Sequence, residues 1–175
     1  MASSTIAGIR WQLRDTVSQT DRDAVRRLVE KTGFFHVDEV DVAVELVDER
    51  LARGEQSGYH FVFVETDGVL AGYASFGPIP CTESSYDLYW IAVDPEFQRH
   101  GIGRMLMSAV ESRIAACGGQ RIYIDTSGRD QYAPTRAFYE ACVFHREATL
   151  KDFYAASDDR LIYAKAGASR DGAPI

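Results

Sequence analysis

The sequence predicts an α/β (α+β) fold with about six to seven strands and about four helices. Some short segments alternate polar and apolar residues or run together in apolar ones, whereas others repeat apolar residues at helical spacing. Gly, Pro and Asp separate these segments and mark the turns between them. The 175 residues suit one domain, which can bury about two thirds of its unfolded surface. We expect this domain to span residues 1–167 and residues 168–175 to form a flexible tail.

The first half of the chain carries signals for one strand, two helices and a β-hairpin. The first strand alternates polar and apolar residues, and each helix has an apolar stripe along one face. Asp67-Gly68 is a two-residue turn typical of hairpins. The predicted elements are, in order, a strand over 9–14, a helix opening at Asp21, a helix from Asp38 to about Arg53, and hairpin strands over 59–65 and 69–76.

The second half combines strands of buried type with two further helices. The pair Gly118-Gly119 ends the longer helix, because glycine commonly follows the last helical turn. The predicted elements are a strand over 87–93, a long helix from about 102 to 118, a strand over 121–126, a short helix over 134–142, and closing strands near 143–150 and 161–165.

A glycine-punctuated loop follows the strand that ends at Val93. Gly101 and Gly103 lack the Cβ atoms that would keep a ligand's phosphate away from backbone N–H groups. The next helix begins here, and its first N–H groups have no intrahelical partner. A dinucleotide fingerprint would need a third glycine at Leu106, and a P-loop would need Lys followed by Ser or Thr. The loop therefore predicts a phosphate-binding site of another kind, with a plain structural turn as the alternative.

The run Gln98-Arg99-His100-Gly101-Ile102-Gly103, preceded by a strand and Val93-Asp94-Pro95, matches the pattern Q/R-x-x-G-x-G/A. It resembles the GNAT superfamily of N-acetyltransferases, whose domains also share the predicted order of elements. The resemblance implies a mixed, mostly antiparallel central sheet, a loop that holds the pyrophosphate of acetyl-coenzyme A, and a strand that runs beside the pantetheine arm. The cofactor-binding residues that it implies are Ile91, Ala92, Val93, Gln98, Arg99, His100, Gly101, Ile102, Gly103, Arg104 and Tyr132.

The same resemblance implies which side chains take part in acetyl transfer. Tyr139 lies in a segment similar to the family's A-x-x-x-Y helix, whose tyrosine can donate a proton to the leaving thiolate. The alternative is a core aromatic residue. Asp87 and Asp125 match positions where GNAT members place a general base, and Glu83 is a third candidate. Each carboxylate could instead be a solvated group, and a free amine would need no base.

Two positions depart from the family pattern. Tyr132 stands where the family commonly has an asparagine that helps to hold the pantetheine or phosphate end. It could replace the asparagine by stacking or through its hydroxyl, or it could be a loop aromatic. Val143 stands where a glycine usually precedes the phenylalanine of the next strand.

The resemblance places the amine acceptor between the first two helices and the loops near the final strands. The residues expected to bind it are Phe34, Phe35, Glu83, Tyr154 and Asp159. Aromatic walls with carboxylates suit a primary amine of a small molecule or peptide, although these aromatics could instead fill the core. We therefore predict an N-acetyltransferase that works by direct attack in a ternary complex. A catalytically silent acyl-coenzyme A sensor or scaffold is the alternative, and a nucleotide-phosphate site in an unrelated α/β enzyme is a third hypothesis.

Composition and sequence signals bear on which partners and which cellular location we expect. A net charge of -7 disfavours a nucleic-acid partner, no apolar run is long enough to cross a bilayer, and the start of the chain lacks the features of a secretory signal. Cys81, Cys117 and Cys142 lack the spacing of a metal site or a disulfide framework, and we expect them to be buried. We thus expect a cytoplasmic protein without metal, nucleic-acid or membrane partners, which could form a homodimer through an exposed strand edge.

Overall fold

The computed structural model describes residues 2–6 and 9–167, so the predicted flexible tail lies outside the described residues. The chain divides into two compact units. Unit 1 consists of residues 1–77 and 90–110, and unit 2 consists of residues 78–89 and 111–175. Strand β5 (Ser85–Val93) and helix α3 (Ile102–Ala116) contribute residues to both units.

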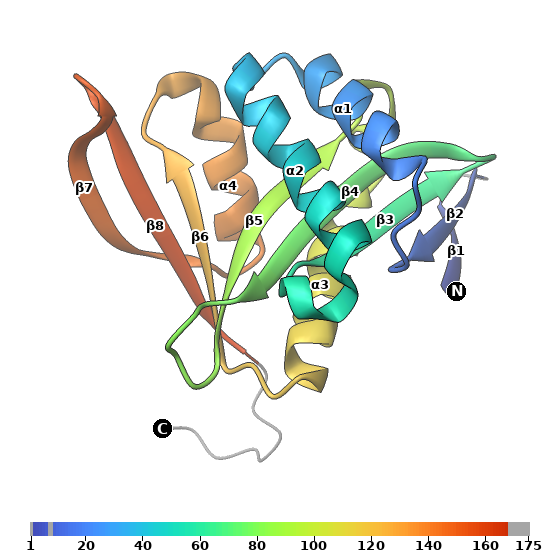
Figure 1. Cartoon of the computed structure of the whole chain (residues 1–175). Helices are drawn as coiled ribbons and strands as arrows, with labels where there is room; N and C mark the ends of the chain where they lie inside the picture. Colours follow the sequence, from blue (N-terminus) through green and yellow to red (C-terminus); the bar gives the residue numbers. More distant parts are fainter. Residues whose placement is uncertain (1, 7–8, 168–175) are drawn as a thin grey trace. The chain divides into compact units, whose positions relative to one another are not determined.

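Unit 1 holds the N-terminal strands, two complete helices and the first part of α3 (Figure 1). Its strands follow the order β1-β2-β3-β4-β5, and β1/β2, β2/β3 and β3/β4 are antiparallel pairs. Asp67 and Gly68 both have positive φ and close the β3–β4 hairpin, as their turn chemistry predicts. The other elements of this unit are β1 Ala2–Ile6, β2 Ile9–Arg14, α1 Asp21–Thr32, α2 Val37–Arg53, the 3-10 helix η1 Gly54–Ser57, β3 His60–Thr66, β4 Val69–Pro78 and the 3-10 helix η2 Pro95–Phe97.

The core of unit 1 forms where α1 and α2 pack on β3 and β4 (Figure 1). The apolar stripes of the two helices face the sheet, because residues three and four apart share one helix face. Phe61 and Phe63 lie on one face of β3, since alternate residues of a strand point the same way. The buried residues of this core are Val25, Leu28, Val29, Val40, Ala43, Val47, Phe61, Phe63, Tyr73 and Ala92.

Unit 2 is built around β6, β8 and β7, with α4 between β6 and β7 in the chain (Figure 1). The first residues of β5, Ser85–Asp87, pair in parallel with β6, and β8 is antiparallel to both β6 and β7. Cys142 caps the C-terminus of α4, and its N–H donates to the carbonyls of Phe138 and Tyr139. The elements are β6 Arg121–Ser127, the 3-10 helix η3 Asp130–Tyr132, α4 Ala133–Ala141, β7 His145–Ala155 and β8 Asp158–Ala166.

The structure confirms the predicted α/β class, the order of the predicted elements and the four α-helices. Eight strands are present among the described residues, because β1 pairs with β2 without an apolar pattern that could have predicted it. The last two strands extend beyond their predicted ends and meet in a tight turn at Ala156-Ser157. The expectation of buried cysteines was wrong, since Cys81 and Cys117 are exposed and Cys142 is partly buried. Within the described ranges, every helix is too short or too polar to cross a bilayer.

Candidate active site

The predicted phosphate-binding loop lies in unit 1 between β5 and α3. As predicted, β5 ends at Val93, a turn containing η2 follows, and α3 begins at Ile102. Asp94 caps η2, because its carboxylate accepts a hydrogen bond of 2.9 Å from the N–H of Glu96. The N–H of Asp94 donates to the carbonyl of Ala71 at 2.9 Å. These two bonds fix the point at which the chain leaves β5.

The glycine loop, residues 98–103, then turns into α3. Arg99 and Gly101 have φ angles of 64° and 78°, and glycine adopts the second of these without steric cost. The first helical bond joins the N–H of Met105 to the carbonyl of Gly101 at 3.0 Å. The N–H groups of residues 102–104 therefore precede the intrahelical pattern and can bind an anion. Among the predicted cofactor residues, Ile102 is buried, His100 and Gly103 are half-buried, and Gln98, Arg99, Gly101 and Arg104 are exposed.

Buried aromatic packing supports this loop. Trp11 on β2 is fully buried, and its ring centroid lies 5.7 Å from that of Phe97 and 6.2 Å from that of His100. The Nδ1 atom of His100 lies 2.9 Å from the carbonyl oxygen of Gln98. The imidazole of His100 therefore contacts both the loop backbone at Gln98 and Trp11 of β2.

A close approach at Gly72 brings β4 against the start of α3. A Cβ atom at this position would lie 3.0 Å from the carbonyl oxygen of Ala92 and 3.0 Å from Cγ2 of Ile102. It would also lie 3.2 Å from Cδ1 of Leu106. Any side chain at Gly72 would push against both the predicted pantetheine strand, residues 91–93, and the first turn of the helix that follows the glycine loop.

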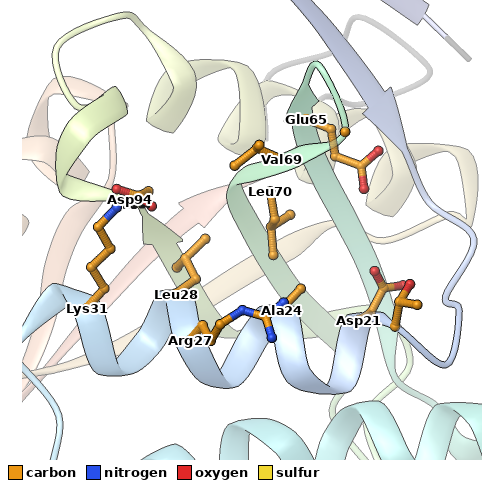
Figure 2. Close-up of a pocket in the computed structure, with 11 residues that line it drawn as sticks. Asp21, Ala24, Arg27, Leu28, Lys31, Glu65, Val69, Leu70 and Asp94 are labelled. Atoms are coloured by element: carbon orange, nitrogen blue, oxygen red, sulfur yellow. Dashed lines mark hydrogen bonds and ion pairs between the residues drawn. The ribbon is translucent and has the colours of Figure 1, made fainter.

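A pocket of about 400 Å³ lies on unit 1 between α1 and the β3–β4 hairpin (Figure 2). At one end, Lys31 points toward Asp94, with Nζ 2.9 Å from Oδ2 of Asp94 and 3.1 Å from Oε1 of Glu96. The hydrogen bond to Asp94 is the main cause that raises the pKa of Lys31. At the other end, Asp21 and Glu65 flank the pocket. Sequence analysis missed Lys31, because it lies 63 positions from Asp94 in the chain.

Tyr139 belongs to unit 2, where α4 holds it in the interior. Only 5% of the residue is exposed, and its ring centroid lies 5.8 Å from that of Phe138, 6.4 Å from that of Phe144 and 6.0 Å from that of Tyr163. Burial raises the pKa of the Tyr139 phenol well above its ordinary value. Tyr139 is therefore at once a core aromatic residue and a phenol that stays protonated at neutral pH.

The two predicted base carboxylates have different surroundings in unit 2. Burial is the main cause that raises the pKa of Asp87, the charge of Asp125 raises it further, and Arg160 lowers it. Asp125 is exposed and forms an ion pair with Arg160. The guanidinium of Arg160 lies 4.9 Å from the ring centre of Phe153. Asp125 is therefore engaged by a cation, whereas Asp87 takes up a proton more readily than an ordinary aspartate.

A polar network around the buried residues Ser127 and Asp158, which sequence analysis did not predict, fixes the segment between β6 and α4. Ser127 donates to Oδ1 of Asp158 at 2.5 Å, and Nε of Arg129 lies 3.0 Å from Oδ2 of the same carboxylate. Arg136 donates to the carbonyls of Ser127 and Arg129 at 2.9 Å and 2.8 Å. The guanidinium of Arg129 lies 5.5 Å from the ring centre of Tyr132. Tyr132, which replaces the family's asparagine, thus stands beside a cation immediately before α4.

Val143 keeps a glycine-like backbone conformation in the turn after α4. Its φ of 66° lies in the left-handed region, which a β-branched residue rarely adopts. The N–H of Val143 donates to the carbonyl of Glu140 at 2.9 Å, and the N–H of Phe144 donates to the carbonyl of Tyr139 at 3.0 Å. The turn is therefore retained although the glycine is not.

The predicted acceptor residues of unit 1 lie in the short connection between α1 and α2. Phe34 is 38% exposed. The ring centroid of Phe35 lies 4.7 Å from that of Trp90 on β5. One aromatic ring thus faces outward, and the other packs against the strand that leads to the glycine loop.

The predicted acceptor residues of unit 2 lie mostly in strands rather than in loops. Tyr154 is exposed on β7, and Asp159 lies on β8. Lys151 lies 2.7 Å from Asp159 and lowers the pKa of that carboxyl, as does a hydrogen bond from the N–H of Asp152. Glu83 is exposed between β4 and β5. Asp159 therefore stabilises the β7–β8 hairpin in addition to any role toward a substrate.

Comparison with known proteins assigns the chain to a family. Residues 19–144 match the acetyltransferase (GNAT) family. A solved structure from Desulfovibrio desulfuricans, assigned to the same family, is 51% identical with a TM-score of 0.89, over 90% of this chain and 99% of that one. A structure of aminoglycoside 6'-N-acetyltransferase complexed with coenzyme A shares the fold, with a TM-score of 0.74 at 18% identity over 91% of this chain and 99% of that one.

A curated relative extends the comparison to a longer protein. The amino-acid acetyltransferase of Ralstonia nicotianae is 28% identical over 137 residues, which are 73% of this chain. The match spans only 29% of the length of that relative. The family match itself runs from α1 through the glycine loop to the turn before β7, and this chain therefore belongs to the GNAT family of acetyltransferases.

Proposed function

We propose that this protein is an N-acetyltransferase that moves an acetyl group from acetyl-coenzyme A to a primary amine of a small molecule or peptide. The observation that carries the proposal is the glycine loop, which turns from β5 into the N-terminus of α3 in a chain of the GNAT family. The coenzyme A complex of a protein with the same fold supports the choice of donor. The donor would supply an activated thioester and a thiolate leaving group.

The residues of the glycine loop fit an anionic ligand. The N–H groups of residues 102–104 and the exposed cations Arg99 and Arg104 favour a pyrophosphate at the start of α3. We assign residues 91–93 to the pantetheine arm. The parallel pairing of β5 with β6 includes Ser85–Asp87, and we assign later backbone N–H groups of β5 as donors to the developing oxyanion.

Tyr139 and Asp87 are assigned to the proton movements of the reaction. The neutral amine nitrogen forms a bond to the acetyl carbon, the carbon–sulfur bond breaks, and the electron pair leaves with sulfur. A protonated phenol at Tyr139 can then give its proton to the thiolate, and the proton that the nitrogen loses on becoming an amide returns to the phenolate. Asp87 is favoured as the base that receives the ammonium proton through water, because its pKa is raised while Asp125 is held by Arg160.

The acceptor is assigned as an amine, and the side chains proposed to bind it are aromatic or acidic. Phe34 and Tyr154 offer exposed rings, and Glu83 offers an exposed carboxylate. The proposed set also includes Phe35, which packs on Trp90, and Asp159, which accepts a hydrogen bond within the β7–β8 hairpin. A net charge of -7 fits a cationic acceptor better than a nucleic acid. The proposal includes a cytoplasmic location and a homodimer formed through an exposed strand edge, for which β1 and β7 are the candidates.

The test follows thiol release from acetyl-coenzyme A while the protein meets amino acids, polyamines, aminoglycosides and short peptides with free N-termini. Release that depends on one acceptor is the expected result and names the substrate class. Binding of coenzyme A without release in the presence of any acceptor would favour the silent sensor or scaffold. Preferential binding of ATP over coenzyme A in a thermal-shift comparison would contradict the choice of donor.

A further inference from the structure

We propose that Lys31 is a positioning residue that couples the acceptor-side connection, residues 33–36, to the glycine loop. The proposal rests on the proposed function, because it takes residues 33–36 as part of the acceptor site and residues 98–103 as the coenzyme A site. All the contacts that carry it lie within unit 1.

The first contact joins Lys31 to the point where the chain leaves β5. The Asp94 side chain is only 9% exposed, and its two oxygens have separate partners. Oδ1 accepts the N–H of Glu96, and Oδ2 accepts Nζ of Lys31 at 2.9 Å. Lys31 thus holds the residue that starts the turn toward the glycine loop. A shift of Lys31 would move this carboxylate, and η2 with it.

The second contact joins the residues after Lys31 to the same strand. Gly33 caps α1 with φ of 69°, and Thr32 donates to the carbonyl of Val29 at 2.7 Å, so the chain turns two residues after Lys31. Phe35 then packs on Trp90 with ring centroids 4.7 Å apart. A short and well-anchored connection therefore leaves little freedom between the Lys31 contact and the Phe35 contact.

Together the two contacts bracket the predicted pantetheine strand. Phe35 holds Trp90 on one side of residues 91–93, and Lys31 holds Asp94 on the other. Two other basic residues of α1 face α2 instead: Arg22 pairs with Asp48, and Arg26 pairs with Asp41. Ordering of the glycine loop by a ligand should therefore restrict residues 33–36 through Lys31, and by thermodynamic reciprocity an acceptor should tighten coenzyme A.

Amide hydrogen–deuterium exchange with and without coenzyme A tests this coupling before the acceptor is known. In the parent protein we expect coenzyme A to slow exchange both in residues 98–104 and in residues 32–37. In Lys31→Met, protection of residues 98–104 should persist while protection of residues 32–37 is lost. Lys31→Arg should restore the parent pattern, because it keeps a cation within reach of Asp94. Arg26→Met is the matched control, since it removes an α1 ion pair that does not touch β5, and it should behave as the parent.

Kinetics give a second readout once an acceptor is found. Lys31→Met should raise the KM for acetyl-coenzyme A by about five-fold or more, in the range of ordinary coupling between sites, with kcat little changed. Asp94→Asn, which keeps an oxygen for the cap but loses the charge, should give the same pattern. Equal protection of residues 32–37 in Lys31→Met and the parent would overturn the coupling. Absence of protection at residues 98–104 in the parent would instead overturn the proposed coenzyme A site, so the two failures are distinguishable.

Discussion

Replacement of Val143 by glycine should stabilise the protein, although most substitutions destabilise. The left-handed conformation at φ of 66° costs a β-branched residue about 1–3 kcal/mol. Val143 is 59% exposed, so removal of its side chain loses little packing. Glycine offsets about 0.5–1 kcal/mol of this stabilisation, because it loses more conformational entropy on folding than valine does. We therefore expect the free energy of unfolding to rise by about 0.5–2 kcal/mol.

Thermal unfolding of Val143→Gly measures this difference. For a chain of this size the expected gain corresponds to an unfolding midpoint higher by about 1–8 °C. Val143→Ala is the control, since it removes the β-branch but keeps the Cβ atom that the left-handed conformation disfavours. The hydrogen bonds around the turn are backbone bonds, so acetyl transfer by Val143→Gly should match that of the parent. A lower midpoint in Val143→Gly than in the parent would refute the strain assigned to this turn.

Four further substitutions test the catalytic assignments and the packing beneath the glycine loop. Tyr139→Phe should lower turnover at saturating acetyl-coenzyme A by about ten-fold, a modest loss because the thiolate of a thiol with a reference pKa of about 8.5 leaves without much help. Its unfolding midpoint should change little, since its ring contacts remain, and unchanged turnover would exclude the proton-donor role. Asp87→Asn should abolish the acidic limb of the pH–rate profile. Arg160→Met should move that limb to higher pH, because Arg160 lowers the pKa of Asp87. Profiles of both variants that overlay the profile of the parent would exclude Asp87 as the base. Gly72→Ala should lower the unfolding midpoint by about 2–12 °C, because overpacking costs about 1–3 kcal/mol. It should also weaken coenzyme A binding, because the added Cβ would press on Ile102. A midpoint equal to that of the parent would contradict the close approach at Gly72.

Local signals account for most of what sequence analysis predicted correctly. Helix stripes, the Asp67-Gly68 turn and the glycines of the loop act over a few residues, so their consequences can be followed along the chain. Strand β1 was not predicted, because its extended conformation depends on pairing with β2 and not on an alternating pattern of its own. The ends of β7 and β8 were not predicted for the same reason, since each strand is extended by its partner.

Short-range periodicity and turn chemistry specify the order of the predicted elements, the glycine loop at the start of α3 and the helix that carries Tyr139, so the amino-acid sequence is enough to predict these features. Three further features appear only in the folded chain: Lys31 holds Asp94, Arg160 engages Asp125, and burial raises the pKa of Asp87. Such contacts join residues 63 and 35 positions apart. Ion pairing and desolvation depend on which distant groups share a low-dielectric neighbourhood, and that neighbourhood exists only once the strands and helices have packed.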